Sequence, residues 1–166
     1  YGLCEAVVLA PTTVVMGTLS KALGVSGGYV ACSLLLRDHL INRAGGFIFS
    51  TAPSPLVVGA ALKAWELVPS LDAQRAALLH RAEELRQGLR RLGLDHGASS
   101  THIVPVSLGT PEATLSAKDA LAGQGILVSA VRPPTVPQGT SRLRIGLSAA
   151  HTDENLDLLL TALGSL

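Results

Sequence analysis

The sequence predicts an α/β fold, and three observations support this prediction. Short apolar runs rich in β-branched residues, which are typical of strands, alternate with segments in which apolar residues recur at helical spacing. Glycines and prolines separate many of these segments. Hydrophobic residues make up 48% of the 166 residues and charged residues 15%, which indicates a globular protein with an apolar core rather than a disordered chain.

The N-terminal part is expected to contain strands followed by helices. Residues 14–17 and 28–33 are predicted strands, and the second is continuously apolar, as in strands covered on both faces. Residues 34–43 predict a helix, and residues 45–51 are expected to leave it through a glycine pair as an extended segment. A serine cap followed by proline at the first helical position predicts a helix over 54–68.

The pair Pro69-Ser70 marks the predicted boundary between two domains, residues 1–68 and 69–166. After it, leucines at helical spacing oppose charged residues, which predicts a helix lying on a sheet and ended by Gly93. A basic recognition helix is the alternative interpretation of this stripe. Further predicted elements are strands over 103–108, 126–131 and 142–147, helices over 110–122 and 153–163, and a proline-rich loop over 133–139. Their order predicts a small sheet with helices on one side.

Composition argues against several classes of partner. The net charge of +1 gives no electrostatic basis for binding nucleic acid or an anionic membrane, and 3% aromatic residues is too few for a base-stacking surface. The sequence contains no run of about 18 apolar residues and no charged-then-apolar leader. Cys4 and Cys32 lack metal-binding spacing, so free thiols in a reducing compartment are expected. We therefore predict a cytoplasmic protein without a metal, nucleic-acid or membrane partner.

The segment Gly17-Thr18-Leu19-Ser20-Lys21-Ala22-Leu23-Gly24 is the most informative motif. It places one lysine among small and apolar residues, between a predicted strand and a glycine-rich turn. Desolvation in such surroundings disfavours the charged ammonium and so favours the neutral amine that a nucleophilic lysine requires. Thr18 offers a hydroxyl and a backbone N–H that could hold a phosphate near this amine. An ordinary surface lysine is the alternative from the residues alone.

This segment resembles the cofactor-lysine segment of the α-oxoamine synthases, pyridoxal 5'-phosphate (PLP) enzymes of fold type I that condense an amino acid with an acyl-CoA. The resemblance implies that Lys21 carries PLP and moves the α-proton, and that Thr18 contacts the cofactor. In that family the lysine lies past the middle of a chain more than twice as long. We therefore expect the C-terminal portion of such an enzyme, with residues 1–68 ending the large PLP-binding domain and 69–166 forming the small α/β domain.

Two further motifs suit the recognition of carboxylates. In Arg132-Pro133-Pro134-Thr135 the prolines stiffen a loop, and its spacing alone leaves a structural connector and a substrate loop equally open. Arg142 and Arg144 alternate on a predicted strand and so share one face, where an arginine can grip a carboxylate with two hydrogen bonds. The family resemblance implies that Arg144 binds the amino-acid carboxylate and that Thr135 and Arg132 contact substrate. Arg142 is interpreted as an exposed charge on an edge strand.

Ser50 and Thr51 precede the helix predicted over 54–68, and hydroxyls at such positions usually form turns or caps. The resemblance implies instead that they reach the partner's cofactor phosphate across the interface of a homodimer.

The proline loop and the arginine strand are most similar to the biotin-pathway branch of the family, which condenses L-alanine with pimeloyl-CoA or its carrier-protein equivalent. Three alternatives stay open. One is a sister enzyme that uses glycine, such as 2-amino-3-ketobutyrate CoA ligase or 5-aminolevulinate synthase. Another is a fold-type I aminotransferase, and the third is a truncated chain that is inactive alone, which we expect for the isolated 166 residues.

Overall fold

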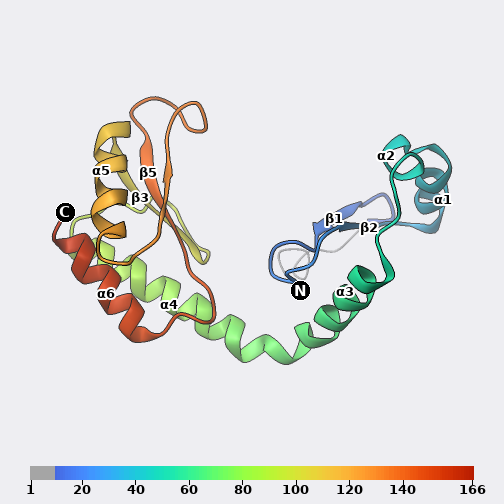
Figure 1. Ribbon diagram of the computed structural model, residues 1–166, viewed down its shortest axis with the longest axis horizontal. Coiled ribbons are helices and arrows are strands. Elements are labelled where there is room, and N and C mark those ends of the chain that lie inside the picture. The colour runs from blue at the N-terminus through green and yellow to red at the C-terminus, as the bar shows by residue number, and fades with distance from the viewer. Residues whose placement is uncertain (1–9) are drawn as a thin grey trace. The chain divides into compact units, whose positions relative to one another are not determined.

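The computed structural model describes residues 10–166 (Figure 1). Cys4 lies outside the described residues. The chain divides into two compact units, the first ending at Ser70 and the second spanning Leu71–Leu166. Among the described residues, no helix is long and apolar enough to cross a membrane.

A β-hairpin opens the described part of the first unit. Strands β1 (Val15–Thr18) and β2 (Gly28–Ala31) pair antiparallel, with Val15 opposite Ala31 and Thr18 opposite Gly28. Both strands confirm the prediction, but the expected burial of the second strand on both faces is wrong, because all four residues of β2 are exposed. The cause is general to this unit: none of residues 10–70 is buried, so they supply no core that could cover the hairpin.

Three helices follow the hairpin. Helix α1 (Leu34–Arg43) confirms the prediction. Residues 45–51 were expected to be extended, and this is wrong: Gly45–Ile48 form the short helix α2, whose first turn closes when the N–H groups of Phe47 and Ile48 both donate to the Ala44 carbonyl at 2.9 Å. Helix α3 (Pro55–Leu67) begins as predicted, with the Ser54 hydroxyl accepting from the N–H of Val57.

The second unit is a three-stranded antiparallel sheet with three helices. A short 3₁₀ segment, Val68–Leu71, leads into helix α4 (Asp72–Arg91), which Gly93 follows at a φ of 72°. The strand order is β3-β5-β4, so β5 is central. The elements after α4 are β3 (Ile103–Gly109), α5 (Pro111–Ala122), β4 (Ser129–Val131), β5 (Ser141–Gly146) and α6 (Asp153–Gly164).

The strand predicted over 126–131 forms only in its last three residues. The C-terminus of α5 explains the difference, because Gly125 adopts a φ of 79° and the N–H of Ile126 donates to the Leu121 carbonyl at 3.0 Å. This closure belongs to the common glycine-ended helix termini. Ile126 is therefore committed to the helix end rather than to the sheet.

Side chains of β5 alternate between the core and the open face of the sheet. Ser141, Leu143 and Ile145 are buried, whereas Arg142 and Arg144 point to the opposite face, as the strand period predicts. Helices α4, α5 and α6 pack on the buried face (Figure 1). The predicted helix-on-sheet role of α4 is confirmed, because Leu85 and Leu89 lie in this core.

A charged network fixes α4 to the segment that precedes β3. The buried Arg86 donates from Nε to Glu83 Oε2 and from Nη1 to the Thr101 carbonyl, both at 2.8 Å. Arg90 donates from Nη2 to Glu83 Oε1 at 2.7 Å. The hydrogen bonds from Arg86 and then from Arg90 lower the pKa of Glu83 to about 2.

The first prediction concerns the pH dependence that Glu83 gives to folding. Because its pKa is lower in the folded state, its contribution is present above the ordinary carboxyl pKa of about 4.3 and is lost as pH falls through about 2. Glu83→Gln should lower the free energy of unfolding near neutral pH. It should also make this free energy decrease less as the pH falls from about 4.3 to about 2. Urea unfolding at several pH values measures this. Glu84→Gln is the matched control, and an equal effect in both variants would contradict the assignment.

The second prediction tests the core under the central strand. Leu143 is fully buried on β5, whereas Leu127 is 89% exposed. Leu143→Ala should lower the free energy of unfolding by about 2–5 kcal/mol through lost burial and a cavity. Leu127→Ala should change it by no more than about 0.5 kcal/mol. Denaturant unfolding of the 166-residue chain distinguishes the two, and equal losses would show that the buried face is misassigned.

Candidate functional site

Lys21 lies in the loop that closes the β1–β2 hairpin. At the neck of this loop, the N–H of Leu19 donates to the Gly27 carbonyl at 2.9 Å, and the N–H of Val25 donates to the Leu19 carbonyl at 3.0 Å. Gly24 and Gly27 have φ angles of 64° and 121°, a region that favours glycine. The glycines of the motif therefore determine the path of the loop that presents Lys21.

The Lys21 side chain is exposed, and the predicted desolvation is not met within the described residues. Its amine makes no hydrogen bond or ion pair with any residue in the 10–166 range. The reason is the lack of buried residues between 10 and 70, since desolvation needs a surrounding core. Within residues 10–166 the amine thus has no partner, and this part of the chain does not enclose it.

Hydroxyl groups gather beside the lysine loop. Thr18 ends β1, and its Oγ1 lies 2.7 Å from Ser20 Oγ and 3.4 Å from the Gly27 carbonyl oxygen. The N–H of Ser20 also donates to Thr18 Oγ1 at 3.2 Å. Thr18 was predicted from the sequence and Ser20 was not, although a hydroxyl directly before Lys21 is also a candidate for contacting a phosphate. Two hydroxyls are therefore available near the lysine for an oxygen-rich group such as a phosphate.

A cavity of about 620 Å³ adjoins Thr18 in the first unit. Its walls come from the hairpin and from helices α1 and α2, and they are mostly apolar, including Met16, Tyr29, Ile41 and Phe47. Thr18 is the one sequence-predicted site residue among those that line it.

Ser50 and Thr51 lie in the irregular segment between α2 and α3, and both are exposed. Ser50 Oγ donates to the Phe47 carbonyl at 3.3 Å, which is an ordinary turn contact. Helix α1 starts from the end of the hairpin opposite the lysine loop, and these residues follow it. Within the described residues, no hydrogen bond joins either side chain to the lysine loop.

Arg144 is presented on the open face of the sheet in the second unit. Its neighbours across the ladder are Pro105 on β3 and Ser129 on β4. Both side chains are short, and the Arg144 side chain is exposed between them. A central strand anchored by buried Leu143 and Ile145 therefore presents an exposed guanidinium, a group whose geometry suits a planar anion.

The loop after β4 carries Arg132 and Thr135, which are both exposed. The N–H of Thr135 donates to the Arg132 carbonyl at 3.0 Å, so the two residues bracket one turn. The peptide bond between Pro133 and Pro134 is cis. Arg132 directly follows Val131, which pairs with Arg142, so the structure brings Arg132 and Thr135 to the same small sheet as Arg144.

Arg142 differs from its prediction as an exposed charge on an edge strand. Strand β5 is central, and Arg142 is half-buried, with Nε donating to the Thr140 carbonyl at 2.9 Å. Its charge also acts on Asp95. The pKa of that carboxyl is lowered mainly by the Gly97 N–H at 2.8 Å and then by the Ser107 hydroxyl, with a smaller contribution from Arg142.

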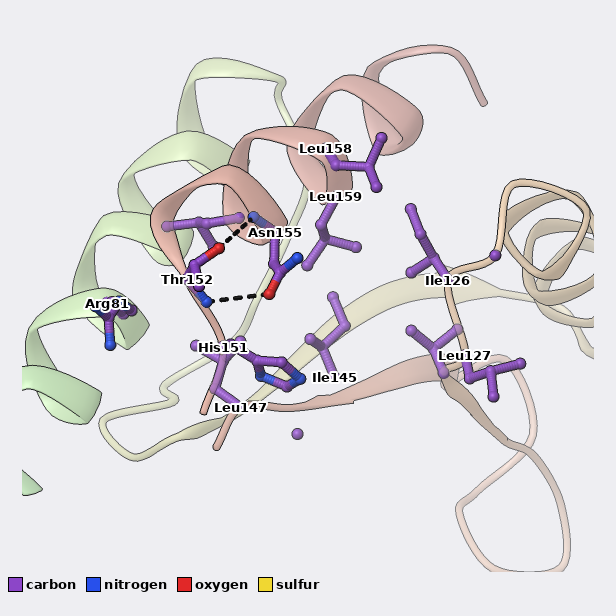
Figure 2. Close-up of a pocket in the computed structure, with 14 residues that line it drawn as sticks. Arg81, Ile126, Leu127, Ile145, Leu147, His151, Thr152, Asn155, Leu158 and Leu159 are labelled. Atoms are coloured by element: carbon purple, nitrogen blue, oxygen red, sulfur yellow. Dashed lines mark hydrogen bonds between the residues drawn. The ribbon is translucent and has the colours of Figure 1, made fainter. Parts of the chain in front are cut away.

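A second cavity, of about 240 Å³, lies on the helix side of the same sheet. Figure 2 shows it between α6, the end of β5 and residues 125–128, with the His151 ring turned toward it. Thr152 and Asn155 on its wall bond to each other as the cap of α6, and the N–H of Ser148 donates to His151 Nδ1 at 3.1 Å. No sequence-predicted site residue lines this cavity.

Several known proteins are similar to this chain. 8-Amino-7-oxononanoate synthase of Gluconacetobacter diazotrophicus is 49% identical over 148 residues, covering 89% of this chain and 37% of the relative. The synthase of the same name from Anaeromyxobacter dehalogenans is 46% identical over 166 residues, covering 99% and 42%. The chain thus spans about two-fifths of the length of the curated relatives it matches.

Solved structures agree on the fold. Serine palmitoyltransferase of Sphingomonas wittichii superimposes with a TM-score of 0.86 at 28% identity, over 92% of this chain and 39% of that one. A serine palmitoyltransferase of S. paucimobilis, solved with bound PLP, gives a TM-score of 0.85 at the same identity and coverage. The predicted fold class, α/β in the manner of the C-terminal portion of fold-type I PLP transferases, is confirmed.

The family itself follows from the extent of the sequence match. The profile of aminotransferase class I and II matches residues 5–163, which is nearly the whole sequence. The matched range includes the lysine loop, the proline loop and the arginine strand. The chain therefore belongs to the aminotransferase class I and II family.

Proposed function

We propose that the protein carrying these residues is a PLP-dependent acyltransferase that condenses L-alanine with pimeloyl-CoA, or with pimeloyl-carrier protein, to give 8-amino-7-oxononanoate, CO₂ and the free thiol. The observation that supports this most is the Lys21 amine, which has no partner among the described residues and lies on a glycine-shaped loop beside two hydroxyls. The names of the relatives support the choice of product.

The residues present fit PLP. Its aldehyde needs a lysine amine, and Lys21 has no competing partner within the described residues. Its phosphate needs donors, and Thr18 and Ser20 offer two hydroxyls beside the loop. When bound, PLP supplies an electron sink that stabilises negative charge at the α-carbon of the amino acid.

The other proposed roles follow from the chemistry of each side chain. The Lys21 amine takes the proton from the α-carbon of L-alanine, as a positioned general base. Arg144 binds the substrate carboxylate through two parallel hydrogen bonds, and Arg132 and Thr135 contact the acyl substrate. Ser50 and Thr51 are proposed to reach the cofactor phosphate of the partner in a homodimer.

We also propose that residues 1–68 end the large PLP-binding domain, that residues 69–166 form the small domain, and that the protein is cytoplasmic. The 166 residues alone are expected to be inactive. Because residues 10–70 bury no side chain, they do not hold the lysine loop in a closed pocket by themselves.

The third prediction tests the lysine. In the complete protein, Lys21→Ala should remove the visible absorbance band that appears with PLP and should abolish release of CoA from pimeloyl-CoA. Lys63→Ala is the matched control, because Lys63 is exposed on α3 with its amine 3.2 Å from Glu66. A band that survives in Lys21→Ala would exclude Lys21 as the cofactor lysine. Product formation that depends on a keto acid, without CoA release, would indicate an aminotransferase instead.

The fourth prediction tests the carboxylate site. Arg144→Lys keeps the charge but loses the paired hydrogen bonds, so the KM for L-alanine should rise about tenfold or more, with a smaller change in kcat. Arg91→Lys on the exposed surface of α4 should leave both constants unchanged. The same assay with glycine as substrate separates the sister enzymes, since a preference for glycine would overturn the choice of L-alanine.

A further inference from the structure

An aromatic side chain lies across the strand that leads into the lysine loop. Gly17 on β1 pairs directly with Tyr29 on β2. A Cβ atom added to Gly17 would lie 2.5 Å from the Tyr29 phenol oxygen and closer still to its ring. The φ of Gly17 is not in the left-handed region, so the glycine is needed for space rather than for backbone conformation. An aromatic ring that covers a cross-strand glycine is a known device for pinning strand register.

The Tyr29 ring also contacts α3. Trp65 contacts Tyr29 edge to face, with ring centroids 5.5 Å apart and planes at 86°. Such pairs contribute beyond the area they bury because the ring edge of one meets the face of the other. A methyl group at position 17 would therefore have to displace the Tyr29 ring and disturb its contact with Trp65.

The hairpin needs such a fixed point. Each strand has four residues, and an isolated two-stranded hairpin is marginal in water. Side chains alternate along a strand, so a slip by one residue would move the Thr18 hydroxyl to the opposite face and shift the loop that carries Lys21. Thr18 directly follows Gly17, so the Gly17–Tyr29 pair lies next to the residue that is proposed to contact the PLP phosphate.

We propose that Gly17, Tyr29 and Trp65 are positioning residues for the cofactor lysine. The Tyr29 ring, braced by Trp65 and seated on Gly17, fixes the register of the β1–β2 hairpin and thereby the positions of Thr18 and Lys21. None of the three touches the reacting atoms in this role. This inference rests on the proposed function, because it explains the hairpin register by the need to place Thr18 and Lys21 for PLP binding.

The fifth prediction tests this arrangement by PLP titration of the complete protein, followed by the visible absorbance band that depends on Lys21. Gly17→Ala should raise the Kd for PLP about tenfold or more, because its methyl group displaces the ring. Tyr29→Phe keeps the ring and should stay within about twofold of wild type. Gly59→Ala on α3 is the matched control, because no described atom lies within 4 Å of its added Cβ.

A double variant keeps the test sharp even if Gly17→Ala folds poorly. In a Tyr29→Ala background the ring is gone, so adding Gly17→Ala should cost little further affinity. The two substitutions should therefore be strongly non-additive in Kd. Additive losses, or a Gly17→Ala variant that binds PLP like Gly59→Ala, would overturn the positioning role. A wild-type protein without any Lys21-dependent band would instead overturn the proposed function, and the cofactor purpose assigned to this register with it.

Discussion

The alternation of side chains along the central strand β5 determines both the core of the second unit and the side chains on the open face of its sheet. Leu143 and Ile145 enter the core, so Arg142 and Arg144 must point to the other side. A shift of one residue would bury two guanidinium groups without partners and expose the leucine and isoleucine, which is strongly unfavourable. The burial of Leu143 and Ile145 on one face of the sheet therefore determines that the arginines lie on the opposite face. No further interaction is needed to direct Arg144 there.

The first unit is organised by a different principle. Because none of residues 10–70 is buried, its elements depend on local determinants. A serine caps α3, glycines with positive φ shape the lysine loop, and the Gly17–Tyr29 pair sets the hairpin register. Such determinants specify the backbone conformation of the residues around them but bury little apolar surface. The path of the lysine loop is thus determined locally, whereas residues 10–70 do not enclose it.

Features that carry a specific local signal were predicted correctly, and the features that were missed have two different causes. The cap at Ser54 and the helix end at Gly93 are local signals, and each marks its element correctly. The short helix α2 and the closure of α5 at Ile126 were missed because one turn of backbone hydrogen bonds outweighed an apolar, strand-like composition. The exposure of Lys21 and the central position of β5 depend on tertiary packing and sheet order, which spacing does not encode.

The strand order β3-β5-β4 has a consequence for how the sheet meets other chains. Both of its outer strands are poor templates for a further strand. Strand β4 has only three residues, and β3 carries Pro105, which lacks the N–H needed to extend a ladder. This small sheet therefore resists β-augmentation and the intermolecular pairing that leads to aggregates. Pro105 thus has two effects. It prevents a further strand from pairing fully with β3, and, as the neighbour of Arg144 on β5, its short side chain leaves the guanidinium exposed.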